Sequence, residues 1–284
     1  MSPTTVHEPP STAAATRPGL VAVAPRRDGA DDGGMDPAVQ IRLEDVGISF
    51  VHSYDRALNL RAHLRWMAKR ALRGHRPKLH HAVDGVTLDI REGEVVGIIG
   101  PNGCGKSTLL RTMSGIYWPD RGRVVRRGRV SALLSLGTGF DNEQSGRANI
   151  LLNGMILGMS REEIEARVDE VVRFADIGDH IDMPMKFYSS GMISRVGFAI
   201  VLAMRPDVIL VDEVFSVGDL AFSRKAEGAM DTMLGRASCQ VLVSHDLGLI
   251  ETRCTRVIRM QAGRIIDDGD PVRVVADYRR EAGG

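Results

Sequence analysis

The feature that most constrains this chain is a glycine-rich loop between an apolar run, Val95–Ile99, and the start of a helix-like segment, Leu109–Met113. The glycines let the backbone bring its N–H groups close to phosphate oxygens, and a following helix adds its positive end. We therefore predict a nucleoside triphosphate site in which Lys106 reaches the β- and γ-phosphates and Ser107 binds Mg²⁺. The loop matches the pattern G-x-x-x-x-G-K-[ST] and runs Gly100, Pro101, Asn102, Gly103, Cys104, Gly105, Lys106, Ser107 and Thr108.

Composition narrows the class of protein further. A hydrophobic content of 43% in 284 residues is ample for a globular core. The net charge of +1 gives no overall bias toward nucleic acid or membrane. Three widely spaced cysteines form no metal-ligand pattern and fit a reduced cytosolic compartment. No apolar run has the length of a bilayer span, and no signal peptide pattern is present.

The N-terminal part predicts a tail followed by an antiparallel pair of strands. Residues 1–38 are rich in Pro, Ala, Thr, Asp and Gly without periodicity, which predicts a disordered tail. Met35, just before the first patterned segment, is an alternative start of the protein. Alternating apolar residues from Ile41 to Phe50 predict one strand, and Val83–Ile90 predicts a second. The predicted nucleotide-binding domain therefore covers residues 39–284.

An insertion, Asp55–His81, separates these two strands. Apolar residues at helical spacing form one stripe, and Lys and Arg without any Asp or Glu fill the stretch from Arg56 to Lys78. A basic amphipathic helix of this kind favours a membrane surface or a docking partner. The alternative is an ordinary surface helix packed on its own domain. The adjoining basic face consists of Arg61, Arg65, Lys69 and Arg73.

The second half of the chain predicts a helical lobe at residues 142–190 and further buried strands. Ser160–Glu163 has the pattern of a capping box at the start of one helix, and another helix is expected from Gly191 to Met204. Val208–Val211 and Val241–Val243 are continuous apolar runs, which are typical of buried parallel strands. A hairpin is expected at residues 256–266, and a last helix begins at Pro271.

Polar residues follow both buried strands. Asp212 and Glu213 end the first, and His245 follows the second. Because ligands of α/β proteins bind at the carboxyl ends of the strands, these groups should meet the phosphate loop. Asp212 would then hold Mg²⁺, and a second carboxylate would activate the attacking water.

The ordered motifs resemble those of the ATP-binding cassette (ABC) ATPases. The resemblance covers about Ile41 to Tyr278 and includes Phe215–Asp219 after the carboxylates and Val243–Asp246 around the histidine. At the place of the family's Leu-Ser-Gly-Gly-Gln signature stand Tyr188, Ser189, Ser190, Gly191 and Met192. The resemblance implies an α/β P-loop fold with a mainly parallel core sheet, an antiparallel β subdomain and a helical signature lobe.

The resemblance also implies a mechanism. Two copies would bind ATP and Mg²⁺ head to tail, each ATP lying between the phosphate loop of one copy and the signature of the other. Glu213 would be the general base, and His245 would contact the γ-phosphate. An aromatic residue near the end of the first strand would stack on adenine; Phe50 is the best match and Tyr54 the second.

Departures from the family pattern favour the branch that exports polysaccharides such as O-antigen, teichoic acid, capsule or galactan. The loop that usually carries a glutamine has Ser135 instead, and Ser145–Ile150 has Ala148 where that branch usually has Glu. This branch has a helical insertion where Asp55–His81 lies. The chain ends at Gly284, which leaves no room for the C-terminal carbohydrate-binding domain of some members.

The expected function is thus the ATP-hydrolysing subunit of an exporter of lipid-linked polysaccharide, peripheral on the cytoplasmic face of the bacterial inner membrane. Its partners would be a second copy of itself and a pair of membrane permease subunits, with anionic lipid possible at residues 56–78. No nucleic acid is expected. The alternative is a soluble ABC ATPase that acts on nucleic acid or ribosomes, with the basic insertion contacting phosphate backbones.

Overall fold

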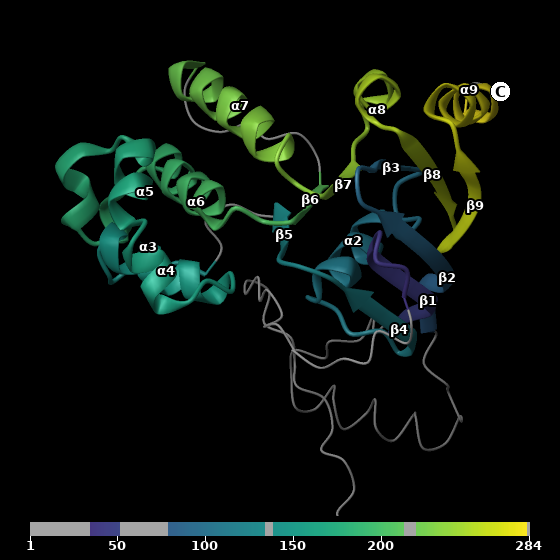
Figure 1. The fold of residues 1–284 in the computed structure, drawn as a ribbon, viewed down its shortest axis with the longest axis horizontal. Helices are drawn as coiled ribbons and strands as arrows, with labels where there is room; N and C mark the ends of the chain where they lie inside the picture. Colours follow the sequence, from purple (N-terminus) through teal and green to yellow (C-terminus); the bar gives the residue numbers. More distant parts are fainter. Residues whose placement is uncertain (1–34, 52–78, 134–138, 213–219, 283–284) are drawn as a thin grey trace, which may run out of the picture.

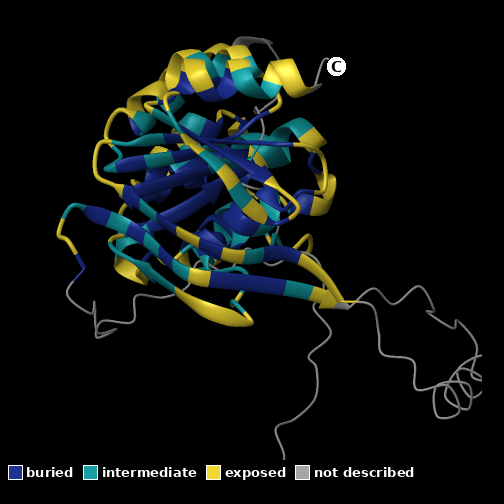
Figure 2. Cartoon of the chain, turned by 90° about the vertical axis from the view of Figure 1, so that its right-hand side faces the viewer, coloured by how far each residue is buried: buried dark blue, intermediate teal, exposed yellow. Residues whose placement is uncertain are grey.

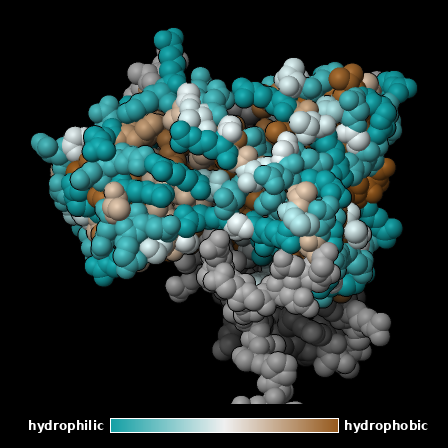
Figure 3. Space-filling view, in the orientation of Figure 1, coloured by the Kyte–Doolittle hydropathy of each residue, from teal (hydrophilic) through white to brown (hydrophobic). Residues whose placement is uncertain are grey.

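The computed structural model describes residues 35–51, 79–133, 139–212 and 220–282. The predicted tail up to residue 34 and most of the predicted insertion, residues 52–78, lie outside this part. Within it, no helix is both long enough and apolar enough to cross a bilayer. The face shown in Figure 3 is mainly hydrophilic, with small apolar patches.

A three-stranded antiparallel sheet forms one layer, with the order β2-β1-β4. Its strands are β1 (Val39–Val51), β2 (Leu79–Arg91) and β4 (Arg121–Arg126). The alternating apolar residues of β1 and β2 point to one buried face, as their period of two requires. The antiparallel pair expected from the sequence is therefore confirmed. At its end Phe50 pairs with His80, and Val51 pairs with Leu79.

A six-stranded sheet forms the second layer, with the order β5-β6-β7-β3-β8-β9. All neighbouring strands run parallel except β8 and β9, which form the predicted antiparallel hairpin. The strands are β3 (Val95–Ile99), β5 (Val130–Leu133), β6 (Val208–Asp212), β7 (Cys239–Val243), β8 (Arg256–Gln261) and β9 (Arg264–Gly269).

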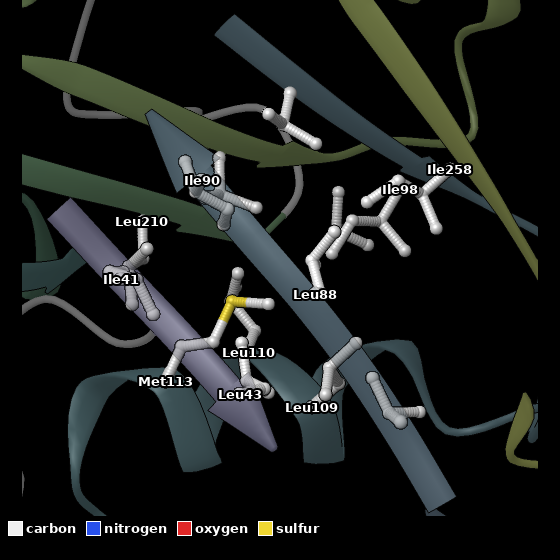
Figure 4. Close-up of a cluster of buried hydrophobic side chains, with 14 of the residues drawn as sticks. Ile41, Leu43, Leu88, Ile90, Ile98, Leu109, Leu110, Met113, Leu210 and Ile258 are labelled. Atoms are coloured by element: carbon white, nitrogen blue, oxygen red, sulfur yellow. The ribbon is translucent and has the colours of Figure 1, made fainter. Parts of the chain in front are cut away.

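Helix α2 (Lys106–Ser114) contacts strands of both sheets, and its apolar side lies in the main core. Figure 4 shows Leu109, Leu110 and Met113 of this helix beside Ile41 and Leu43 of β1. The buried residues are concentrated on the inner faces of the layers, and the exposed ones on the outside (Figure 2). The phosphate loop is therefore anchored at its C-terminal end by the largest apolar cluster.

Two helices that the sequence did not predict, α7 (Leu220–Leu234) and α8 (Leu247–Arg253), cover the other side of the six-stranded sheet with α9 (Pro271–Ala282). Successive residues of β3 show the two faces: Ile98 belongs to the core around α2, and Ile99 packs with Ile250 of α8 and Val274 of α9. The six-stranded sheet is thus covered on both faces, by α2 and the antiparallel sheet on one and by α7, α8 and α9 on the other, as buried parallel sheets require.

A separate group of helices forms a lobe beside the sheets, at the left of Figure 1. It has its own apolar cluster, which includes Ile150, Val171 and Ile200. The elements are α3 (Gly146–Ile156), α4 (Arg161–Glu165), α5 (Val168–Ala175), the short 3₁₀ turns η1 (Gly178–Asp182) and η2 (Met185–Phe187), and α6 (Ser190–Met204).

The predicted capping box at Ser160 is confirmed: its hydroxyl accepts the Glu163 N–H, and the Glu163 side chain accepts the Ser160 N–H. The prediction of one continuous helix after it is wrong, because α4 ends before Arg167 and α5 begins after it. Ile164 packs against Gly154 of α3, and the Arg167 guanidinium donates to the Ala203 carbonyl of α6. These tertiary contacts override the local helical periodicity.

Candidate nucleotide-binding site

The phosphate loop joins β3 to α2 and has the backbone that its glycines predict. Gly100 has φ +146°, and a Cβ there would lie 2.2 Å from the Met260 carbonyl oxygen. Gly105 has φ +108°, and a Cβ there would lie 2.0 Å from the Ala82 carbonyl oxygen. Both positions need glycine because the loop is pressed against neighbouring backbone. Gly105 is the N-cap of α2, so the positive end of that helix faces the loop.

Lys106 is 7% exposed and folds back over the loop. Its ammonium donates to the carbonyl oxygens of Gly100 at 2.7 Å and Pro101 at 3.1 Å. These bonds use two of the three donors of the ammonium and hold its charge at the centre of the loop. A polyanion at this place would meet a cation that is already desolvated, where Coulomb attraction is stronger than in water.

A cavity of about 580 Å³ opens over the loop. The strand ends bring their polar groups to it: Asp212 is the last residue of β6, and His245 follows β7. In the register of the sheet Val243 pairs with both Asp212 and Ile98, which places all three strand ends beside the loop. The lining residues are Phe50, His80, Ala82, Asn102, Gly103, Gly105, Lys106, Ser107, Thr108, Asp212, Val243 and His245.

The donor set fits a hard cation. Ser107 and Asp212 supply a hydroxyl and a carboxylate to one cavity, and Mg²⁺ prefers oxygen ligands with few carboxylates, using phosphates and water for the rest. Among the described residues, no cluster of three or more His, Cys, Asp or Glu side chains could hold a metal by itself. Ser107 and Asp212 would therefore hold Mg²⁺ together with the nucleotide.

Phe50 is 40% exposed and lines the cavity at the end of β1. Its ring makes an edge-to-face contact with Tyr117 at 5.7 Å between centroids, which fixes the ring at the rim. His80, the register partner of Phe50, also lines the cavity and was missed by the sequence reasoning. The predicted pairing of the two strands could have pointed to His80. Its exact register could not be predicted, because the insertion separates the two strands and the local sequence pattern does not fix how they pair.

The Tyr188–Met192 segment stands at the start of α6, in the helical lobe at the left of Figure 1. Ser189 is the N-cap of α6, and its hydroxyl accepts the Met192 N–H at 3.2 Å. Ser190 is exposed at the start of the helix, and Gly191 is half-buried. None of these residues is among those that line the cavity.

Tyr188, at the position where the family has leucine, is buried in the lobe. Its hydroxyl donates to the His180 carbonyl, and burial raises the pKa of this phenol, which keeps it protonated as a donor. A Cβ on Gly146 would lie 2.3 Å from the Tyr188 oxygen. Tyr188 therefore ties the start of α6 to η1, through its hydrogen bond, and to Gly146 of α3, through packing.

Cys104 is 4% exposed and belongs to the main core. Its sulfur would lie 2.9 Å from a Cβ on Gly100, and Cys104 is not among the residues that line the cavity. The remaining predicted positions, Glu213, Ser135 and Tyr54, lie outside the described residues.

Comparisons with known proteins find the same family of phosphate-loop proteins and the same fold. A model of the ABC transporter family matches residues 83–216, which include the phosphate loop and the segment through Asp212. The fold is similar to a dimeric ATP-binding cassette bound to ADP and Pi, with a TM-score of 0.58, 20% identity, and coverage of 81% of this chain and 98% of that one. An ATP-binding subunit of an ABC transporter gives a TM-score of 0.59 at 20% identity, covering 86% of this chain and 93% of that one. The predicted fold class is confirmed.

Three proteins found by sequence comparison have higher sequence identity to this chain than these two solved structures have. The O-antigen export system ATP-binding protein RfbB of Myxococcus xanthus is 45% identical over 217 residues, which is 76% of this chain and 49% of that protein. The protein of the same name from Klebsiella pneumoniae is 36% identical over 75% of this chain and 86% of its own length. The teichoic acids export protein TagH of Bacillus cereus is 38% identical over 70% of this chain and 36% of its own.

The matched part of this chain spans about half the length of the Myxococcus protein and nearly all of the Klebsiella one. The family match at residues 83–216 contains the phosphate loop, the strand that ends in Asp212 and the helical lobe up to α6, which bears out the resemblance deduced from the motifs. The chain belongs to the ABC transporter family of ATP-binding proteins.

Proposed function

We infer that this chain is the ATP-hydrolysing motor subunit of an ABC transporter that exports a lipid-linked polysaccharide. The observation that carries the proposal is the single cavity that gathers Lys106, Ser107, Asp212 and His245 from three strand ends. The relatives named for O-antigen and teichoic acid export support the choice of cargo. The lipid would be part of the exported cargo, and the permease would be a separate membrane protein.

Each residue has a role in the proposed reaction. The loop amides and Lys106 would bind the phosphates, and Ser107 and Asp212 would hold Mg²⁺, which when bound would supply positive charge against the phosphates. Glu213, directly after Asp212, orients and deprotonates the attacking water. His245 donates to the γ-phosphate from the neighbouring strand end. Phe50 stacks on adenine at the rim.

The proposed assembly is a head-to-tail dimer. Because the Ser189–Met192 segment does not line the cavity of its own chain, it is free to complete the cavity of a second copy. The N-terminus of α6 would then offer backbone N–H groups and the Ser189 hydroxyl to the γ-phosphate. The similar solved cassette is itself dimeric, which supports this arrangement.

The proposed location is the cytoplasmic face of the inner membrane, with a pair of permease subunits as partners. We divide the chain into a tail (1–38) and a nucleotide-binding domain (39–284) that carries the basic insertion, predicted at 55–81, and the helical lobe, predicted at 142–190. Residues 79–81 of the predicted insertion belong to β2, and the lobe extends through α6 to Met204. The basic insertion would contact anionic headgroups or the anionic cargo. Action on nucleic acid is the alternative, which the export proteins among the relatives disfavour.

Mixed dimers test the proposal. Lys106→Ala breaks the phosphate loop, and Gly191→Asp places a negative charge where the γ-phosphate would bind; a Cβ on Gly191 has only the Ser189 hydroxyl, at 3.8 Å, near it. Each variant alone should be inactive. A mixture should regain about a quarter of the wild-type ATPase activity, because half of the dimers are mixed and each has one intact site. No recovery, or full activity of a monomer, would contradict the shared site.

A deletion strain tests the proposed cargo. It should lose its surface polysaccharide, and the wild-type chain should restore it while the inactive variants should not.

A further inference from the structure

The turn between β8 and β9 packs directly against the phosphate loop, although it lies far along the chain. The N–H of Gly263 donates to the Cys104 carbonyl at 2.9 Å, and the Gly263 carbonyl accepts the Asp84 N–H of β2 at 2.9 Å. Beside it, the Met260 carbonyl faces Gly100, at 2.2 Å from the place of an added Cβ. The turn therefore ties the phosphate loop to the antiparallel sheet.

The bond to Cys104 fixes the orientation of one peptide unit of the loop. In a trans peptide the C=O and N–H groups point in opposite directions, and the described residues contain no cis peptide. Since the Cys104 carbonyl faces the turn, the N–H of Gly105 faces away from it. Gly105 lines the nucleotide cavity and caps α2. A backbone N–H in this place is a phosphate donor.

Glycine is favoured at residue 263 by both its backbone conformation and its close neighbours. Gly263 has φ +81°, and an added Cβ would lie 3.1 Å from the Ala82 carbonyl oxygen and 3.2 Å from that of His81. A Cβ here would be strained at this φ and would press on β2, so the turn should shift by a few tenths of an ångström and carry the N–H of residue 263 with it. The geometry of the hydrogen bond to the phosphate loop is thus sensitive to a side chain at this position.

We propose that Gly263 is a positioning residue for the nucleotide: its N–H holds the Cys104–Gly105 peptide so that the Gly105 N–H points at the phosphate chain. The inference rests on the proposed ATP binding and extends the site to a turn outside the phosphate loop, the carboxylates, the signature and the histidine. Gly263 acts through the loop and does not itself line the cavity.

The test compares Gly263→Ala with Gly93→Ala. Gly93, in the turn between β2 and β3, has φ +82°, and nothing lies within 4 Å of an added Cβ. Both variants put alanine into the left-handed region and should lose similar stability. Only Gly263→Ala should weaken ATP binding, by about five- to tenfold, as expected for one displaced hydrogen bond. Calorimetric titration with ATP and urea unfolding separate the two effects.

A second variant removes the N–H without adding a side chain. Joining a synthetic C-terminal segment with glycolic acid in place of Gly263 converts this amide to an ester, and ATP affinity should again fall. Equal affinities for Gly263→Ala and Gly93→Ala, or wild-type affinity of the ester, would overturn the inference and leave the proposed function standing. If Gly263→Ala does not fold, the ester variant decides. A wild-type chain that binds no ATP would overturn both.

Discussion

Ser189, the N-cap of α6, allows a test of the signature segment. Its hydroxyl caps the helix and is also proposed to bind the γ-phosphate of ATP held by a second copy of the chain. In the structure the Ser189 oxygen accepts the Met192 N–H at 3.2 Å, from a backbone with φ −70° and ψ 160°. Ser160 caps α4 in the same way, accepting the Glu163 N–H at 3.1 Å with φ −68° and ψ 161°. Both serines are exposed in the helical lobe. Ser160→Ala is therefore a matched control for Ser189→Ala.

Each substitution should reduce the free energy of unfolding by about 1 kcal/mol, the usual cost of removing a serine cap. For a chain of this size that corresponds to a fall of about 2–4 °C in the melting temperature. Only Ser189→Ala should lose ATPase activity, since the same hydroxyl can donate its O–H to a phosphate while it accepts from the backbone. A charge-assisted hydrogen bond contributes about 1.5–3 kcal/mol, which corresponds to a loss of roughly tenfold or more.

The assay is steady-state phosphate release at saturating ATP, with urea unfolding measured on the same samples. If Ser189→Ala and Ser160→Ala have equal ATPase activity, Ser189 acts only as a helix cap. The proposal that Ser189 binds the γ-phosphate of a second copy would then be refuted. If Ser189→Ala leaves the free energy of unfolding unchanged, the cap itself does not contribute. A stability loss in both variants with an activity loss in one alone is the expected result.

Three further predictions follow from the site and the core. Glu213→Gln should keep ATP binding, measured by calorimetry, while single-turnover hydrolysis nearly stops; turnover near the wild-type rate would refute its role as base. Replacing the basic face of the insertion by Gln should preserve ATPase activity but abolish export in cells, and normal export would refute the docking role; the residues are Arg61, Arg65, Lys69 and Arg73. Burial raises the pKa of Cys239 and Cys254 from 9.0 to about 12. Their contribution to stability should be complete below pH 9 and be lost as the pH rises toward 12, so a Cys239→Ala/Cys254→Ala variant should show a shallower alkaline loss in urea unfolding; an unchanged slope would contradict this.

Local pattern predicted those parts of the fold that depend on short-range chemistry. The phosphate loop, the strand that ends in Asp212 and the Ser160 capping box need only neighbouring residues, and the structure has all three. It also predicted that His245 and Asp212 share a cavity, because the ends of parallel strands lie along one edge.

Other parts depend on contacts that no local window contains. The break between α4 and α5 follows from contacts with α3 and α6, and His80 reaches the cavity through a strand register set across the insertion. Helices α7 and α8 were missed because α7 carries charges along much of its length and α8 is only seven residues long. The buried position of Cys104 likewise comes from the packing of the loop against the core.

The pairing of Val51 with Leu79 places both ends of residues 52–78 on adjacent strands. The entropy cost of closing a chain between fixed ends grows slowly with its length, by about 0.6 kcal/mol for each doubling. This junction is therefore a place where evolution or an engineer can exchange one segment for another without rebuilding either sheet. Because Phe50 and His80 pair beside it and line the cavity, a fluorescent domain grafted here would sit next to the nucleotide and could serve as a sensor of its binding.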